Sequence, residues 1–229
     1  MKSMIVFGYN EYAKEIASNF KDDKIELRIC VIDDASYKRA LDDGYTDVEK
    51  VEFDDDWVSI GKEFTISELT CFCALDDDAQ NVFLTISLRA EYPKLNIISL
   101  ATSKDSANKL HLAGANKAVA KLETTANVIV ESLEKPAVVE VMNDILYHNQ
   151  ELKLAQYTIN KGSVLEDMKL HDVKIHEEYD IIILAIADLE LEAELSFTSA
   201  GHEHTIDPGD VLVVMGKEDN LEKFEKAIQ

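Results

Sequence analysis

The residues best placed to bind a ligand follow the first apolar strand. Residues 4–7 read Met-Ile-Val-Phe, Gly8 comes next, and a helical pattern then begins. A glycine between a strand and a helix lets backbone N–H groups approach a phosphate closely. The dinucleotide-binding pattern G-x-G-x-x-G falls on Gly8-Tyr9-Asn10-Glu11-Tyr12-Ala13, where only the first glycine is present. The stretch predicts a nucleotide-type crevice, with Gly8 and Asn10 as candidate binding residues and an altered phosphate loop.

Two side chains of this loop oppose a dinucleotide. Asn10 occupies the second glycine slot, where a Cβ and an amide crowd the path of a pyrophosphate. Glu11, in the first helical turn, suits the helix dipole but repels a phosphate. We therefore expect a cleft that holds NAD⁺ or NADH poorly. An adenine mononucleotide, bound through its ribose, stays open as a ligand.

Asp33 is the candidate for that ribose contact. It ends the second predicted strand, near the spacing at which dinucleotide-binding folds carry an acid for the ribose hydroxyls. The alternative is a structural role, because acids at strand ends often cap the following helix. The sequence leaves both interpretations open.

Other reactive residue types give weaker signals. His202 and His204 would share one side of a strand and could ligate Zn²⁺ or Ni²⁺, but a solvated hairpin tip is the interpretation we favour, so no metal site is predicted. Three cysteines are too few for a disulfide framework. We find no set of nucleophile, base and orienting group, and we expect that the protein is not an enzyme.

Charge excludes further classes of function. The 229 residues carry a formal net charge of −22, which disfavours binding to nucleic acid or anionic lipid. In this sequence no apolar run approaches the roughly 20 residues that cross a bilayer. The first residues do not read as a basic and then apolar secretion signal, so we expect a cytoplasmic location.

Alternating strand and helix patterns fill the first 133 residues. This alternation predicts an α/β fold: a Rossmann-like, mainly parallel sheet with helices on both faces. In the helix expected over 77–90, apolar residues at helical spacing predict one buried stripe of Ala79, Val82, Phe83, Ile86 and Ala90. The expected strands are 3–7, 26–32, 48–53, 69–75, 96–100 and 117–120, and the expected helices are 11–20, 36–43, 57–61, 77–90, 104–113 and 124–133.

The pattern changes after residue 133. We expect a helical crossover over 134–150, whose helix 136–148 is apolar on more than one side and needs more than one cover. A partner chain could supply the second cover. Residues 151–229 predict a smaller α+β lobe of short strands, over 154–159, 180–188, 190–198 and 211–215, with a final helix over 219–228.

Several motifs, in order along both lobes, resemble the RCK (KTN) domains of prokaryotic potassium channels and Trk-type uptake systems. Gly8 and Ala13 look like the family's first βα turn. The further motifs are Leu75-Asp76-Asp77-Asp78-Ala79-Gln80-Asn81, Leu110-x-x-Ala113-Gly114-Ala115-Asn116, Gly162-Ser163-x-Leu165 and Pro208-Gly209-Asp210-x-Leu212-x-Val214-x-Gly216.

The resemblance implies a cytosolic, ligand-sensing domain that regulates potassium conduction through an attached or associated pore. It implies a homodimer through the crossover helix, with Val138, Val141, Met142 and Ile145 at the interface, and in channels a ring of eight lobes. The alternative within the family is a separate Trk-type subunit that senses NAD(H) or ATP/ADP. A Rossmann oxidoreductase is disfavoured by the missing loop glycines.

The resemblance also bears on the ligand. Asp54 falls where the family has a second acidic contact to a nucleotide. Calcium-gated members carry acids at the end of the fifth strand and just beyond it, where this chain has Leu100 and Thr102. We therefore expect no calcium site of that type, and the identity of the ligand stays open.

Overall fold

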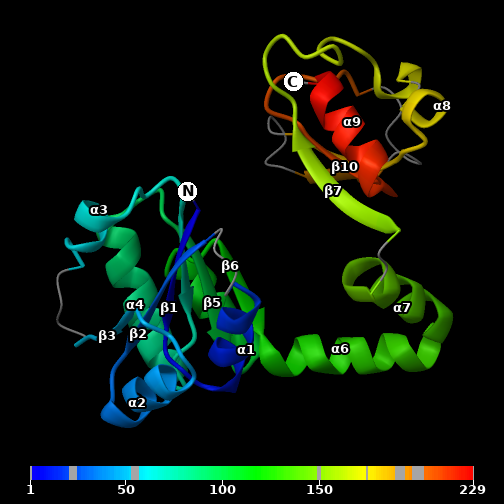
Figure 1. The fold of residues 1–229 in the computed structure, drawn as a ribbon. Coiled ribbons are helices and arrows are strands. Elements are labelled where there is room, and N and C mark those ends of the chain that lie inside the picture. Colours follow the sequence, from blue (N-terminus) through cyan, green and yellow to red (C-terminus); the bar gives the residue numbers. More distant parts are fainter. Residues whose placement is uncertain are drawn as a thin grey trace. The chain divides into compact units, whose positions relative to one another are not determined.

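The computed structural model describes residues 2–20, 25–52, 57–148, 151–173, 175–188, 194–197 and 204–228. They form two compact units, which divide between Val130 and Glu131 (Figure 1). Each unit has a hydrophobic core of its own.

A six-stranded parallel sheet forms the centre of the first unit, in the order β3-β2-β1-β4-β5-β6. This order confirms the predicted Rossmann-like fold. The strands are β1 (Ser3–Phe7), β2 (Glu26–Val31), β3 (Val48–Lys50), β4 (Leu69–Cys73), β5 (Asn96–Ala101) and β6 (Lys117–Ala120). The helices are α1 (Glu11–Asn19), α2 (Asp34–Asp42), α3 (Ile60–Glu63), α4 (Asp78–Glu91), α5 (Lys104–Leu112) and α6 (Lys121–Glu134).

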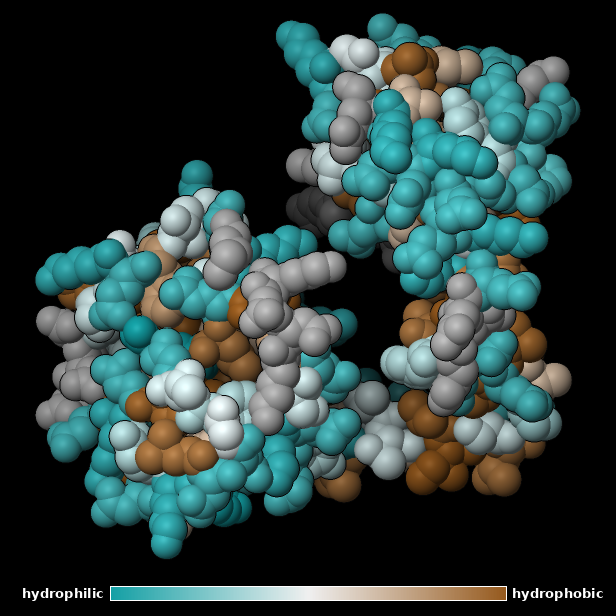
Figure 2. All heavy atoms as spheres, in the orientation of Figure 1, coloured by the Kyte–Doolittle hydropathy of each residue, from teal (hydrophilic) through white to brown (hydrophobic). Residues whose placement is uncertain are grey.

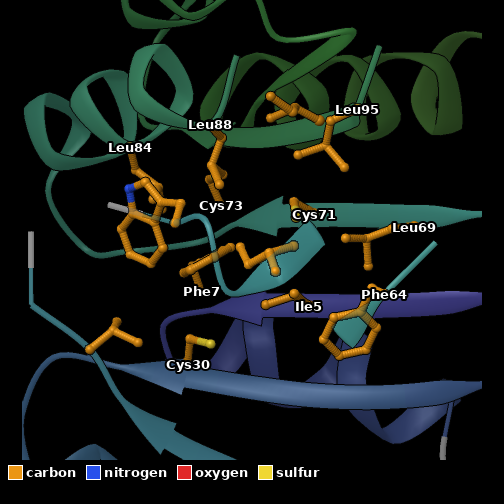
Figure 3. Packing of buried hydrophobic residues seen from close by; sticks show 14 of the residues in the cluster. Ile5, Phe7, Cys30, Phe64, Leu69, Cys71, Cys73, Leu84, Leu88 and Leu95 are labelled. Atoms are coloured by element: carbon orange, nitrogen blue, oxygen red, sulfur yellow. The ribbon is translucent and has the colours of Figure 1, made fainter. Parts of the chain in front are cut away.

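Helices pack on both faces of this sheet. Met4 and Val6 of β1 face α1, whereas Ile5 and Phe7 face α4, as strand alternation requires. Figure 3 shows the α4 side, where Phe7 lies among Cys30, Cys73 and Leu84. The predicted helix over 57–61 begins later, at Ile60, because Trp57 has a left-handed φ of 53°.

The predicted stripe on α4 is wrong. Phe83 and Ile86 are 52% and 50% exposed, and the buried face is instead Asn81, Leu84, Thr85 and Leu88. Two polar residues can occupy the buried face because hydrogen bonds satisfy them: Thr85 Oγ1 lies 2.8 Å from Ser99 Oγ, and Asn81 bonds three backbone groups. Of the predicted stripe, Val82 is partly buried against the cluster that contains Ala107 and Leu110, whereas the other four residues are exposed.

The predicted helix over 124–133 is α6, which begins earlier, at Lys121, and ends at Glu134, where the crossover starts; the crossover contains α7 (Pro136–Asn143), followed by a π-helical turn over Asp144–His148. The predicted helix 136–148 is therefore α-helical only in its first part. Neither α6 nor α7 has a buried residue. The exposed large apolar side chains here are Leu122, Val128, Ile129, Val130, Leu133, Val138, Val141, Met142, Leu146 and Tyr147.

The second unit has the predicted α+β character. An antiparallel sheet in the order β7-β10-β8-β9 packs against the C-terminal helix α9 (Glu218–Ile228). The strands are β7 (Leu152–Thr158), β8 (Ile182–Asp188), β9 (Glu194–Phe197) and β10 (Val211–Lys217), and α8 spans Ile175–Tyr179. Gly209 has a φ of 107° in the turn before β10, as the Pro-Gly-Asp sequence predicts.

Candidate functional site

The candidate site lies at the carboxyl edge of the parallel sheet. The chain runs outward from β1 through β2 to β3 and then returns to β4 on the other side of β1. In open α/β sheets, ligands bind beside such a reversal, here between β1 and β4. The loop from β1 to α1 and the loop from β4 to α4 flank this point.

Gly8 is required by the contact between these two loops. Its φ is 101°, and a Cβ placed on it would lie 2.6 Å from the Ala74 carbonyl oxygen. The Gly8 N–H donates to the Cys30 carbonyl at 2.8 Å, and the Ala74 N–H donates to the Phe7 carbonyl at 2.8 Å. The fold thus explains this glycine without a ligand.

Asn10 bridges the two loops with its side chain. Its Oδ1 accepts from the Ala13 N–H at 3.0 Å and so caps α1. Its Nδ2 donates to the Ala74 carbonyl at 2.8 Å and to Asp76 Oδ1 at 2.9 Å. The amide therefore spans the place where the strand order reverses.

Asp33 caps α2. Its Oδ1 accepts from the Ser36 N–H at 2.8 Å, and bonds from the Ser36 backbone and hydroxyl hold the pKa of the Asp33 carboxyl below its usual value. The carboxylate is nonetheless exposed at the sheet edge. The capping alternative is therefore realised, and the ribose contact stays a prediction. Asp54 lies outside the described residues.

Neighbouring loops are joined by two residues whose roles the sequence did not reveal. Asn81, 1% exposed, accepts from the Leu75 N–H and donates to the Leu75 and Leu100 carbonyls. Asp78 accepts from the Thr102 N–H at 3.0 Å. Both belong to the Asp-Asp-x-x-Asn stretch, which was the only available signal. Hydrogen bonds thus also join the segments that follow β4 and β5.

The charges along this edge of the sheet oppose a pyrophosphate held against the start of α1. Glu11, Asp33, Asp76 and Asp77 are exposed along this edge. Lys50 lies beside it but is paired with Asp34, at 2.7 Å between Nζ and Oδ1. With the Asn10 bridge in place, the described residues do not fit the pyrophosphate of a dinucleotide.

His204 has a structural setting in the second unit. Its Nε2 lies 2.8 Å from Asp210 Oδ2, and its Nδ1 lies 3.4 Å from Asp188 Oδ2. The two carboxylates face opposite ring nitrogens, so they cannot share one ion with the imidazole. Among the residues that the structure describes, no group of three His, Cys, Asp or Glu is arranged to hold a metal. His202 lies outside those residues.

Comparison with known families now identifies the chain. The TrkA-N domain family matches residues 4–121, and this match covers more than half of the chain. The chain belongs to the TrkA-N domain family. The TrkA-C domain matches residues 154–229. Together the two domains confirm the resemblance to RCK domains that the motifs indicated.

Two similar proteins are potassium channel proteins of Methanocaldococcus jannaschii. Potassium channel protein 1 is 26% identical over 235 residues, which cover 98% of this chain and 66% of the relative. Probable potassium channel protein 2 is 28% identical over 160 residues, which cover 68% of this chain and 46% of that relative. The chain thus spans less than two thirds of either relative. In the described part of the chain, no helix has the length and apolarity to cross a membrane.

Solved structures share the fold. The human SLO3 gating ring superposes with a TM-score of 0.69 at 11% identity, over 99% of this chain and 45% of that one. A GsuK channel bound to NAD gives a TM-score of 0.50 at 14% identity, over 100% of this chain and 38% of that one. At these identities the likeness establishes the fold alone.

Proposed function

We propose that this chain is the cytosolic, ligand-sensing regulatory domain of a potassium channel, and that it is not an enzyme. The observation that carries the proposal is the pairing of TrkA-N and TrkA-C domains across an alignment with Potassium channel protein 1 that covers 98% of the chain. In this proposal, ligand binding changes the geometry between chains and so alters the pore. When it is attached to that pore, the domain lies at the inner face of the membrane.

The proposed dimer forms through the crossover. Val138 and Val141 are 56% exposed and Met142 is 45% exposed, whereas Ile145 is partly buried. Figure 2 shows apolar side chains gathered over this segment. Exposed apolar surface of this extent is typical of an interaction site, and a second copy of the chain would cover it.

A second apolar surface supports assembly beyond a dimer. Phe83, Ile86 and Leu112 project from α4 and α5, and Leu112 is 90% exposed. Ile86 and Leu112, together with Val82, line a shallow and open depression on this surface. We assign this surface to contacts between dimers in a ring of eight lobes, because it lies on the first unit and outside the crossover.

Sedimentation tests the dimer. Met142→Glu places a charge in the proposed apolar contact, where its burial is costly. We expect the parent to sediment as a dimer or larger at micromolar concentration and the variant to shift toward monomer. Leu41→Glu, at a 43% exposed position on α2, is the matched control and should leave the dimer intact. A monomeric parent, or equal effects of both variants, would contradict the proposal.

An adenine mononucleotide is the proposed ligand. At about 100 times its Kd, a ligand adds about 2.7 kcal/mol to the free energy of unfolding, which melting detects. We expect at most a modest stabilisation by AMP, ADP or ATP, most of it lost in Asp33→Ala. If the stabilisation survives in Asp33→Ala, the ribose contact is wrong.

The Trk-type regulatory subunit is the second candidate, favoured by the TrkA-N and TrkA-C match itself. The full reading frame separates the two. Two apolar segments of about 20 residues around a selectivity filter identify a channel. In that full-length protein, Met142→Glu should change potassium flux into liposomes while the protein stays folded. Leu41→Glu should leave the potassium flux unchanged.

A further inference from the structure

Among the solved structures that share the fold, a GsuK channel is bound to NAD, whereas the loops of this chain at the carboxyl edge between β1 and β4 do not fit a dinucleotide. We propose that Asn10 is the specificity determinant that excludes a dinucleotide, because its side chain bridges the gap that the pyrophosphate must cross. The inference rests on the proposed function only in taking a nucleotide as the class of ligand.

The first argument is the space between the loops. The position of a Cβ on Gly8 is only 2.6 Å from the Ala74 carbonyl oxygen, so the loops from β1 and β4 are already in contact there. Asn10 extends this closure outward, since its amide bonds the same Ala74 carbonyl. A glycine in its place would remove the side chain and reopen the approach of a pyrophosphate to the α1 backbone.

The second argument is that the Asn10 amide has no hydrogen left to offer. Its two N–H groups donate to Ala74 and Asp76, and its oxygen accepts the Ala13 N–H, which is one of the donors that a phosphate at the start of α1 would use. A pyrophosphate would therefore have to break three hydrogen bonds. It would then meet the carboxylates of Asp76 and Glu11.

A simple helix cap would not have this effect. Ser103 caps α5 in the same way, by accepting the Ser106 N–H at 3.2 Å. Its other hydrogen bond is local, to the Ser106 hydroxyl. Asn10 instead reaches residues 64 and 66 positions along the chain. Ser103 is therefore the matched control for loss of a cap without loss of a bridge.

The experiment titrates NADH into the full chain and its variants, read by nucleotide fluorescence and by melting. We expect no saturable binding by the parent. Asn10→Gly should bind NADH saturably. Its Kd should be at least about tenfold smaller than the lowest Kd that the titration of the parent allows. Ser103→Gly loses a cap but no bridge, so it should lose less thermal stability than Asn10→Gly and should gain no binding. Asn10→Ser keeps a cap but shortens the side chain, so it should gain binding even if the glycine variant does not fold.

Three results would overturn the proposal. The first is saturable NADH binding by the parent. The second is a folded Asn10→Gly or Asn10→Ser that gains none. The third is Glu11→Gln alone producing the same gain, because charge and not the Asn10 bridge would then exclude the ligand. Sedimentation of the same variants reports the dimer separately, so failure here is distinguishable from failure of the proposed function.

Discussion

The sequence predicts Gly8, Asn10 and Asp33 as ligand residues, and the structure gives each of them a role in the fold. Gly8 permits a close contact with Ala74, Asn10 caps α1 and bridges two loops, and Asp33 caps α2. A residue type at a strand end is therefore ambiguous by itself. Capping and ligand binding need the same hydrogen-bonding groups at the same place.

The cap at Asp33 predicts a dependence of stability on pH. Loss of such a cap in Asp33→Ala should cost about 1 kcal/mol of unfolding free energy near pH 7. Hydrogen bonds from Ser36 hold the carboxyl pKa below its ordinary 3.8. The ionised carboxylate therefore stabilises the fold at pH values above its ordinary pKa. This stabilisation is lost as the pH falls through the lowered pKa of the folded protein.

Urea unfolding of the parent and of Asp33→Ala, at neutral and acidic pH, checks this prediction. We expect the difference in unfolding free energy to shrink in acid. Asp34→Ala is the control, since Asp34 lies in the first turn of α2 and pairs with Lys50. A difference that grows in acid would contradict the assignment.

At the scale of elements, α4 shows how hydrophobicity can mislead. Its buried face carries Asn81 and Thr85, which hold neighbouring loops and β5 through hydrogen bonds, and its outer face carries Phe83 and Ile86. An apolar stripe on a helix indicates that this face is covered, but it does not indicate whether the same domain or another chain covers it. Here Phe83 and Ile86 are half exposed while Val82 packs against the core of the first unit, and the exposed pair supports the proposed contact with another chain.

Two truncations on α4 test which of its faces is buried. Leu88 is 0% exposed, so Leu88→Ala should cost about 2–5 kcal/mol of unfolding free energy through loss of burial and a cavity. Ile86 is 50% exposed, and Ile86→Ala should cost no more than about 0.5 kcal/mol in dilute protein. Urea unfolding measures both. Similar costs for the two would mean that the orientation of α4 is wrong.

At the scale of the whole molecule, the net charge of −22 attracts cations, but net charge alone does not arrange ligands into a site. Leu100 is 5% exposed, and Thr102 donates its N–H to Asp78. These residues stand where the resemblance places the acids of calcium-gated relatives. Surface charge alone gives weak binding that any divalent ion can share.

Calorimetry with Ca²⁺ and, as the control, Mg²⁺ tests this expectation. Both ions should give weak heats without a stoichiometric endpoint, and they should shift the melting temperature by similar amounts. A stoichiometric site with micromolar affinity for Ca²⁺ over Mg²⁺ would contradict it.

Local patterns were sufficient to predict much of this fold. The bounds of β1 and β6 agree with the alternation in the sequence, and the α/β and α+β characters of the two units follow from strand and helix periodicity. These features depend on residues that are neighbours along the chain. Helix caps and the positive φ of Gly8 and Gly209 are equally local.

Contacts between residues that are distant in the sequence were decided only by the tertiary structure. Asn10 lies 64 positions from Ala74, and the two are joined because β4 inserts beside β1, which no local pattern specifies. The buried face of α4 depends in the same way on Ser99 and Leu100 at the adjacent strand. The sequence alone therefore determined most of the elements and the sheet edge at which the candidate residues lie. The order of the strands determined that this edge is bridged, because only that order brings the Asn10 amide against the Ala74 carbonyl.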